Sequence, residues 1–269
     1  MSETDHTPQR IVSLQPSATV ILHAVGRLER VVACTRYCRE LCPEVEGRAI
    51  VQDSWTAQTE QIVALNPDLV IAAVPYQEKA VAEILKCGAR FLGLAPKTMK
   101  DIYADIASIA GLVGRSAAGE MTIEKMKVEI DAIREQVMHR PRVRVYCEEW
   151  GKPLIASQAW VAELVSAAGG EFVGSPGSHQ IADSIAKEDP HVVVAAWCGA
   201  GDRVPLTKIV AERGWQNMRA VQTGRVYCVR DDYLNTPAPT LLHGLRALAA
   251  AMHPDLFPQV VGLKCIKDL

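Results

Sequence analysis

The chain has 269 residues, of which 49% are hydrophobic and 22% charged, so it is long enough for one large or two modest globular domains. Its formal net charge is -2 and its basic residues are scattered, which argues against nucleic acid or an anionic membrane surface as a partner.

The first ten residues, MSETDHTPQR, are polar and lack the apolar stretch of a signal peptide or membrane anchor. As it stands, the sequence therefore predicts a cytoplasmic protein without membrane insertion, with a periplasmic location as the alternative if an upstream signal is missing. The eight cysteines are then expected to be reduced thiols rather than a disulfide framework.

Short apolar runs alternate with helical patterns through the first part of the chain. Strands are expected at 10–14, 31–35, 69–73 and 90–94, helices at 16–26, 59–66, 77–86 and 99–113, and an irregular connection at 36–55. Strands that alternate with helices predict a mostly parallel sheet.

One stretch occurs twice. TEQIVALNPDLVIAA begins at Thr59, and ADSIAKEDPHVVVAAW begins at Ala182. Each copy predicts a helix that stops ahead of a proline, with an extended residue before that proline, and then a fully buried strand. Two such units more than a hundred residues apart indicate two related lobes.

Between the two copies, residues 116–139 predict one long amphipathic helix, because Ile123, Met126, Ile130, Ile133 and Val137 recur at spacings of three and four. It could be packed on a sheet or be a rigid strut between lobes, and the repeat favours the strut. The expected organisation is an N-terminal lobe (10–115), a connecting helix (116–140) and a C-terminal lobe (141–269).

After Pro141 the alternation restarts. Strands are expected at 143–147, 192–196 and 225–230, helices at 160–168, 206–213 and 241–252, and loops at 148–158, 175–180 and 231–240.

The common catalytic motifs are absent: the sequence contains no GxGxxG, GxxxxGK[ST], GxSxG or HExxH, and no enzyme activity is expected. Cys34, Cys38 and Cys42 are spaced four apart, which leaves a cytoplasmic metal- or cluster-handling protein as an alternative hypothesis. His179 is either a solvated loop residue or a ligand to cobalt or another metal.

Several segments, in order, resemble the helical-backbone (type III) substrate-binding proteins of ABC importers, and most closely their cobalamin-binding branch. The segments are RIVSLQPSATVILHAVG, VVACTRYC, EQIVALNPDLVIA, the long middle helix, VAELVSAAGGEF and GWQNMRAVQTGRVYCV, and the likeness extends from Arg10 to Phe257. The resemblance implies an α/β fold of two Rossmann-like lobes with mostly parallel sheets, joined by one long backbone helix, with a ligand cleft between the lobes.

It also implies a cobalamin-type corrinoid as the bound ligand, no cofactor of the protein's own, and an ABC transporter membrane subunit as a further partner of a monomeric chain. A ferric siderophore or haem, bound by the same fold, is the alternative. Aromatic rings suit a broad apolar corrin face, while a few polar groups fix its orientation.

The residues expected at the ligand lie in loops at strand ends, where open α/β sheets collect ligands. They are Tyr37, Trp55, Tyr76, Trp150, Trp160, His179, Trp197, Asp232 and Tyr233. By the resemblance, Tyr37, Trp55 and Asp232 fall at or next to cleft positions of the cobalamin binder. Thr240 stands where that protein has an arginine.

One acidic residue on each lobe of these importers docks into the transporter, and Glu78 and Asp183 fall close to those places. Their alternative interpretation is as acids that favour a helix N-terminus. The chain departs from the family at Val20, where the usual PSxTE has an acid.

Overall fold

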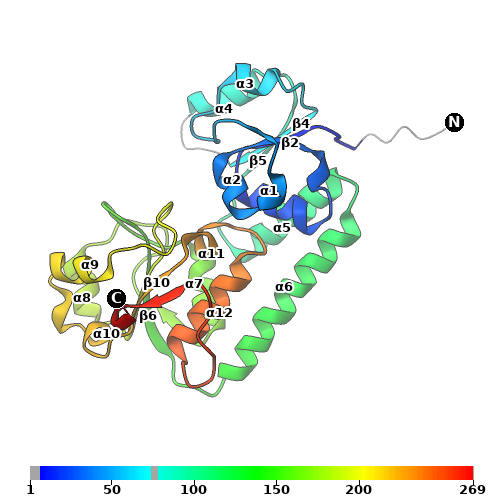
Figure 1. Cartoon of the computed structure of the whole chain (residues 1–269). Coiled ribbons are helices and arrows are strands. Elements are labelled where there is room, and N and C mark those ends of the chain that lie inside the picture. Colours follow the sequence, from blue (N-terminus) through cyan, green and yellow to red (C-terminus); the bar gives the residue numbers. More distant parts are fainter. Residues whose placement is uncertain (1–6, 74–77, 269) are drawn as a thin grey trace. The chain divides into compact units, whose positions relative to one another are not determined.

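A computed structural model describes residues 7–73 and 78–268, and within these ranges the chain folds into two compact units. Unit 1 comprises Met1–Pro96 with Lys100–Lys125, and unit 2 comprises Lys97–Met99 with Met126–Leu269. Each unit is an α/β layer structure built around its own sheet (Figure 1). No helix of the described ranges is both long and apolar enough to cross a bilayer.

Unit 1 has a five-stranded, wholly parallel sheet in the order β3-β2-β1-β4-β5. Its elements are β1 (Ile11–Ser13), α1 (Pro16–Ala24), β2 (Val31–Cys34), α2 (Arg36–Leu41), β3 (Ala49–Ile50), α3 (Thr59–Val63), β4 (Leu69–Ala73), α4 (Glu78–Leu85), β5 (Arg90–Leu94), α5 (Met99–Leu112) and the first part of α6 (Ser116–Val137). The expected irregular connection at 36–55 is wrong, because it contains both α2 and β3. Thr35 caps α2 by accepting a hydrogen bond from the Cys38 amide at 3.1 Å.

Unit 2 has a mixed sheet in the order β11-β10-β9-β6-β7, with β8 also paired to β6. Its elements are β6 (Val143–Gly151), β7 (Leu154–Ala156), α7 (Ala159–Ala167), β8 (Gly170–Phe172), α8 (Ala182–Glu188), β9 (Val192–Ala195), α9 (Leu206–Glu212), α10 (Arg219–Gln222), β10 (Val226–Val229), α11 (Asp231–Asn235), α12 (Leu241–Met252) and β11 (Leu263–Cys265). The parallel pairs among β6, β8, β9 and β10 form its centre, and β7 and β11 are antiparallel additions.

Two expected loops are corrected. Residues 148–158 continue β6 and turn back as β7, and residues 231–240 begin with the helix α11.

The repeated stretch occupies matching places in the two units. β4 lies between β1 and β5, and β9 lies between β6 and β10, each wholly parallel to its neighbours. The prediction of an extended residue before each proline is wrong. Asn66 and Asp189 are left-handed, with φ of 47° and 44°. Asn and Asp tolerate this conformation better than other non-glycine residues, so both copies end their helix with the same local solution.

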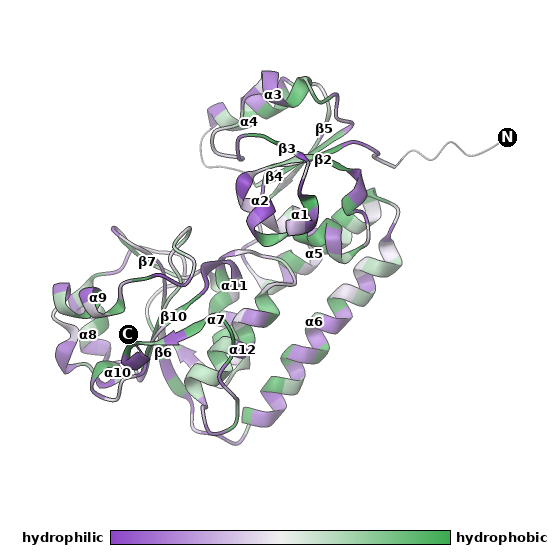
Figure 2. Cartoon of the chain, viewed as in Figure 1, coloured by the Kyte–Doolittle hydropathy of each residue, from purple (hydrophilic) through white to green (hydrophobic). Residues whose placement is uncertain are grey.

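The long helix α6 forms as the periodicity predicts, and Figure 2 shows hydrophobic and hydrophilic residues interleaved along it. Met126, Ile130, Ile133 and Val137 are at most 7% exposed, and they therefore form its buried face. The division between the two units falls inside this helix, after Lys125.

Candidate functional site

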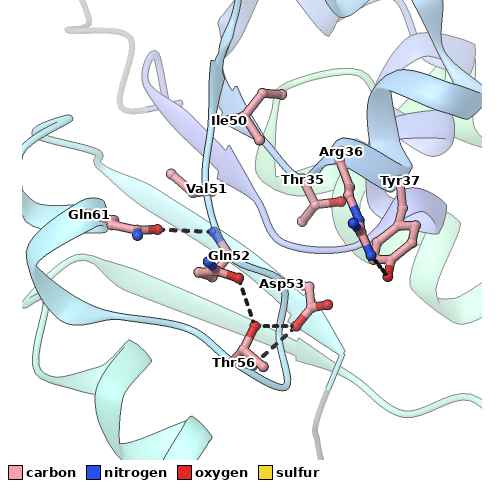
Figure 3. Close-up of a pocket in the computed structure, with 9 residues that line it drawn as sticks. All are labelled: Thr35, Arg36, Tyr37, Ile50, Val51, Gln52, Asp53, Thr56 and Gln61. Atoms are coloured by element: carbon pink, nitrogen blue, oxygen red, sulfur yellow. Dashed lines mark hydrogen bonds between the residues drawn. The ribbon is translucent and has the colours of Figure 1, made fainter.

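In unit 1, the polypeptide leaving β2 and β3 encloses a cavity of about 450 Å³. Figure 3 shows Arg36 and Tyr37 on one side and the segment from Ile50 to Thr56 on the other. The Arg36 guanidinium donates a hydrogen bond to the Tyr37 hydroxyl at 2.6 Å and lies 4.6 Å from the centre of its ring. Arg36 therefore fixes the half-buried Tyr37 ring at the carboxyl edge of the sheet.

Trp55 projects from the next loop and is 47% exposed. Its loop is fastened by the buried Ser54, whose hydroxyl donates to the Leu14 carbonyl at 3.0 Å and accepts from the Ala73 amide at 3.1 Å. These two partners directly follow β1 and end β4. Asp53 accepts hydrogen bonds from the amides of Trp55 and Thr56 at 3.0 and 3.1 Å, which holds the turn itself.

Two other predicted positions belong to this edge of unit 1. Tyr76 lies outside the described residues. Glu78, which the resemblance predicts to dock onto a transporter, is the first residue of α4 and is exposed.

In unit 2, Trp150 and Trp197 line a second cavity of about 420 Å³ at the carboxyl ends of β6 and β9. Trp150 is 43% exposed, and its indole N–H donates to the Lys152 carbonyl at 2.8 Å. Pro205 and Ile209 add apolar surface to the wall. The cavity thus combines two indole rings with aliphatic side chains, a lining suited to a flat apolar ligand.

A buried ion pair positions Trp197. Its indole N–H donates to Glu148 at 2.6 Å, and Glu148 also accepts two hydrogen bonds from Arg213, at 2.7 and 2.9 Å. The Glu148 side chain is only 1% exposed, so its charge depends on this pairing. The Arg213 guanidinium also lies 4.8 Å from the ring centre of the buried Trp215, and this cation–π contact helps to hold Arg213 in place.

The loop after β9 is held by α11. Asp231 accepts hydrogen bonds from the amides of Gly199 and Gly201 at 2.7 and 2.9 Å, and Asn235 donates to the Ala196 carbonyl at 2.7 Å. Burial raises the pKa of Asp231 above its ordinary value. The loop that carries Trp197 is therefore fixed by two side chains of α11, the helix that follows β10.

A second acid, Glu149, lies next to this loop. Burial raises its pKa to about 7, although a hydrogen bond from Gln158 at 2.6 Å opposes the shift. The same environment raises the pKa of the Cys198 thiol to about 12, first by burial and then by the nearby Glu149 carboxylate. At neutral pH this edge therefore offers a protonated thiol and a carboxyl group that can donate or accept a proton.

Asp232 is paired within its own loop. Its carboxylate accepts two hydrogen bonds from Arg230, at 3.0 and 3.2 Å, and is 11% exposed. The Arg230 guanidinium lies 5.4 Å from the centre of the Tyr233 ring, which stacks on His243 at 5.0 Å.

The remaining predicted residues are placed differently. Trp160 packs in the interior, 8% exposed, with its indole N–H donating to the Leu234 carbonyl at 2.9 Å, so we leave it out of the candidate site. His179 is exposed and forms a single bridge to Ile155 of β7. Asp183 is exposed in the first turn of α8.

The three closely spaced cysteines do not act together as one metal-ligand group within the described residues. The Cys38 thiol accepts a hydrogen bond from the Thr35 hydroxyl at 3.2 Å, and the interaction of Cys34 with Cys38 lowers the pKa of Cys38 to about 6 and raises that of Cys34. Cys42 stands apart, and burial followed by the Glu44 charge raises the pKa of its thiol to about 12.

Sequence reasoning missed Arg36, Glu149 and Arg230. Arg36 directly precedes Tyr37, Glu149 directly precedes Trp150, and Arg230 lies two positions before Asp232. A charged residue adjacent to an aromatic one is the signal that could have found Arg36 and Glu149, and a charged residue at the end of an apolar run is the one that could have found Arg230.

The comparison with known proteins covers most of the chain. The model of the periplasmic binding protein family matches residues 11–233. A cobalamin-binding protein of Halobacterium salinarum is 28% identical over 263 residues, which cover 93% of this chain and 70% of that protein.

Two solved structures show the same fold. A periplasmic heme-binding protein from Pseudomonas aeruginosa superposes with a TM-score of 0.83 at 20% identity, covering 96% of this chain and 98% of that one. The periplasmic vitamin B12-binding protein of Vibrio cholerae gives a TM-score of 0.73 at 23% identity, covering 92% and 98%. The fold is therefore that of periplasmic binding proteins with two sheets and a long helix.

Proposed function

We propose that this chain, which belongs to the periplasmic binding protein family, is a non-catalytic solute-binding protein whose ligand is a corrinoid of the cobalamin type. Support for the ligand comes from relatives named for cobalamin or vitamin B12 and from the chemistry of the strand ends.

The observation that carries the proposal is the exposure of tryptophan at the carboxyl edge of both sheets. Trp55 in unit 1 and Trp150 in unit 2 are 47% and 43% exposed, although Trp55 sits in a turn held by Asp53 and Trp150, at the end of β6, donates its indole N–H to the Lys152 carbonyl. Large rigid rings kept at the surface have area to bury against a ligand at low entropic cost. A corrin offers a broad apolar face for such contacts and peripheral amides for polar ones.

The charges around the two cavities favour a corrinoid over a ferric siderophore or haem. Arg36 and Asp53 are the charged side chains that line the cavity of unit 1, and their charges balance. In unit 2, Lys152 and Lys208 lie 3.4 and 3.7 Å from the single carboxylate of Glu212, so that wall carries a surplus of one positive charge. A polyanionic chelate calls for a cluster of unpaired cations, and a corrinoid rimmed with amides does not, so the paired charges of both walls suit the corrinoid better.

We extend the proposal to delivery of the solute to an ABC transporter. Glu78 and Asp183, one in each unit, are exposed acids in the first turn of a helix. Both are available to ion pairing with a basic partner surface, and surface pairs of this kind steer association more than they add affinity.

A titration of tryptophan variants tests the ligand proposal. Trp55→Ala and Trp150→Ala are each expected to weaken cyanocobalamin binding by about tenfold or more, since losing a buried aromatic contact costs roughly 1–3 kcal/mol. Binding is measured by calorimetry at a pH and salt concentration common to all variants.

Val261→Ala is the control, because Val261 is 87% exposed and lines neither cavity. It should bind like the unaltered chain. Equal affinity of both tryptophan variants and the control would show that these edges do not hold the corrinoid.

A further inference from the structure

Three side chains with different donor atoms meet on unit 1, away from the cavities described above. The imidazole of His23, the thiol of Cys42 and the carboxylate of Glu44 each offer a ligand atom, and these atoms all lie within 4.8 Å of one another. His23 and Glu44 are exposed, whereas Cys42 is 3% exposed. The group thus combines a buried sulfur with two exposed side chains.

The fold brings these residues together from two helix ends. His23 occupies the last turn of α1, and Cys42 directly follows α2, where its amide donates to the Cys38 carbonyl at 2.8 Å. Glu44 lies in the 3-10 turn Pro43–Val45 that Cys42 begins. α1 and α2 pack side by side, as Figure 1 shows, so the three ligands come from anchored backbone rather than from a free loop.

Among the described residues, the three donor groups form no hydrogen bond or ion pair that metal binding would have to break. Within residues 7–73 and 78–268, no hydrogen bond or ion pair engages the imidazole of His23, the thiol of Cys42 or the carboxylate of Glu44. By contrast, the Cys38 thiol accepts a hydrogen bond from the Thr35 hydroxyl at 3.2 Å, and neither Cys34 nor Cys38, both free thiols, is part of the group. A cation could therefore bind without breaking an existing contact.

We propose that His23, Cys42 and Glu44 form a binding site for a zinc-type divalent cation, with water as the fourth ligand. Imidazole nitrogen, thiolate sulfur and carboxylate oxygen are the donors that Zn²⁺ accepts in tetrahedral sites, and hard cations such as Mg²⁺ do not favour the sulfur. Metal–ligand bonds of about 2.0–2.3 Å place tetrahedral donors roughly 3.5 Å apart, so the two exposed side chains need to close by only about 1 Å. On binding, the thiol gives its proton to solvent as the sulfur–metal bond forms.

Cobalt(II) substitution tests the site directly, because a Co²⁺–thiolate bond gives a charge-transfer band in the near ultraviolet that an oxygen and nitrogen site lacks. The full chain is purified under reducing conditions without any corrinoid and titrated with CoCl₂. The band and the visible transitions of a four-coordinate site should appear with one Co²⁺ per chain, and ZnCl₂ should abolish them by displacement.

Cys42→Ala should remove the band, and His23→Gln and Glu44→Gln should each weaken Co²⁺ binding by about tenfold or more, as even outer-shell losses at metal sites do. Cys87→Ala, a thiol elsewhere in unit 1, is the matched control and should leave the titration unchanged. His23 and Glu44 are exposed, so their variants keep the test decisive if Cys42→Ala fails to fold.

Absence of the charge-transfer band in the unaltered chain, or its persistence in Cys42→Ala, would overturn the proposal. The site does not rest on the proposed solute, since the readout involves no corrinoid.

Discussion

At the scale of single residues, Gly151 shows how closely the edge of the second sheet is packed. A Cβ atom at this position would lie 2.2 Å from Cζ2 and 2.5 Å from Cη2 of Trp197. The Trp197 indole cannot move aside freely, because it is bonded to the buried Glu148. Glycine is therefore needed at 151 for the ring to stay where it is.

Gly151→Ala is accordingly expected to destabilise the fold by about 1–3 kcal/mol through overpacking and to weaken corrinoid binding. Denaturant unfolding followed by tryptophan fluorescence measures the stability. Gly111→Ala, where the added Cβ would meet only the Ser116 hydroxyl at 4.0 Å, should be neutral or slightly stabilising. A Gly151→Ala protein as stable as the unaltered chain would contradict this view of the packing.

Glu149 makes stability depend on pH in a direction that can be checked. Its pKa is raised from 4.5 to about 7 by burial, so its contribution to stability is fully present below pH 4.5 and is lost as the pH rises through 7. Glu149→Gln removes the ionised form and keeps an acceptor for Gln158. The variant should gain about 2 kcal/mol relative to the unaltered chain at pH 8 and little at pH 4.5.

Urea unfolding at several pH values gives this difference. Asp105, whose pKa is raised to about 6 by burial and by Asp101, is the comparison, and Asp105→Asn should show a smaller gain that is complete at lower pH. A Glu149→Gln gain that is the same at pH 4.5 and pH 8 would contradict the assignment.

At the scale of elements, Ser54 ties the loop that carries Trp55 to the ends of two strands, through its hydroxyl and through its amide, which donates to the Leu14 carbonyl at 3.2 Å. Ser54 is 1% exposed and bridges the Leu14 carbonyl and the Ala73 amide. Ser54→Ala leaves the Ala73 amide without that partner, so a loss of about 1–3 kcal/mol is expected. Because the loop loosens, corrinoid affinity should fall as well.

Chemical unfolding and calorimetric titration of the same preparation check both effects. Ser184→Ala in α8 is the control, since Ser184 is exposed and its hydroxyl has no hydrogen bond among the described residues. It should change stability by no more than about 0.5 kcal/mol. Unchanged stability of Ser54→Ala would show that the bridge does not hold the loop.

The elements with strong periodicity could be read from the sequence. β5 (Arg90–Leu94) and α12 (Leu241–Met252) have the expected bounds, and the predicted buried face of α6 is confirmed at four of its five positions, with Ile123 half-buried. In these segments the pattern of buried residues follows from the spacing of hydrophobic residues within the segment itself, every two residues in a strand and every three to four in a helix.

The elements that the sequence did not predict are those whose formation depends on residues far away in the chain. β6 runs on through Glu148 and Glu149, two acids that break the apolar run and therefore indicated a loop. Glu148 is accepted inside the sheet edge because Arg213, 65 residues later, pairs with it. β11 likewise forms by antiparallel pairing with β10, and its three residues are too short a segment for the sequence pattern to predict a strand.

The candidate site was predictable in kind rather than in detail. Strand-end position predicts Trp55, Trp150 and Trp197 at the ligand. The structure places Trp150 and Trp197 at the wall of the unit 2 cavity and Trp55 at the wall of a third cavity, of about 380 Å³, all at least partly exposed. The same reasoning selected Trp160, which the structure buries, because α7 packs its first turn into the core. Sequence position gives the end of a strand but not the direction in which a side chain turns.

At the scale of the whole molecule, the two units repeat one plan. β1, β4 and β5 in unit 1 correspond in order and direction to β6, β9 and β10 in unit 2, and each set presents aromatic loops at its carboxyl edge. This repetition gives each unit an edge of similar aromatic character. The central claim is that the solute is a corrinoid.

The most direct test is a calorimetric titration of the purified full chain with cyanocobalamin, with haem and a ferric siderophore titrated in parallel and a chelator present to keep free metal ions from the His23–Cys42–Glu44 site. The account predicts saturable binding of one corrinoid per chain, together with a raised Tm, because a ligand that binds only the native state stabilises it by mass action. Saturable binding of haem or the siderophore with no heat and no Tm change for any corrinoid would contradict it.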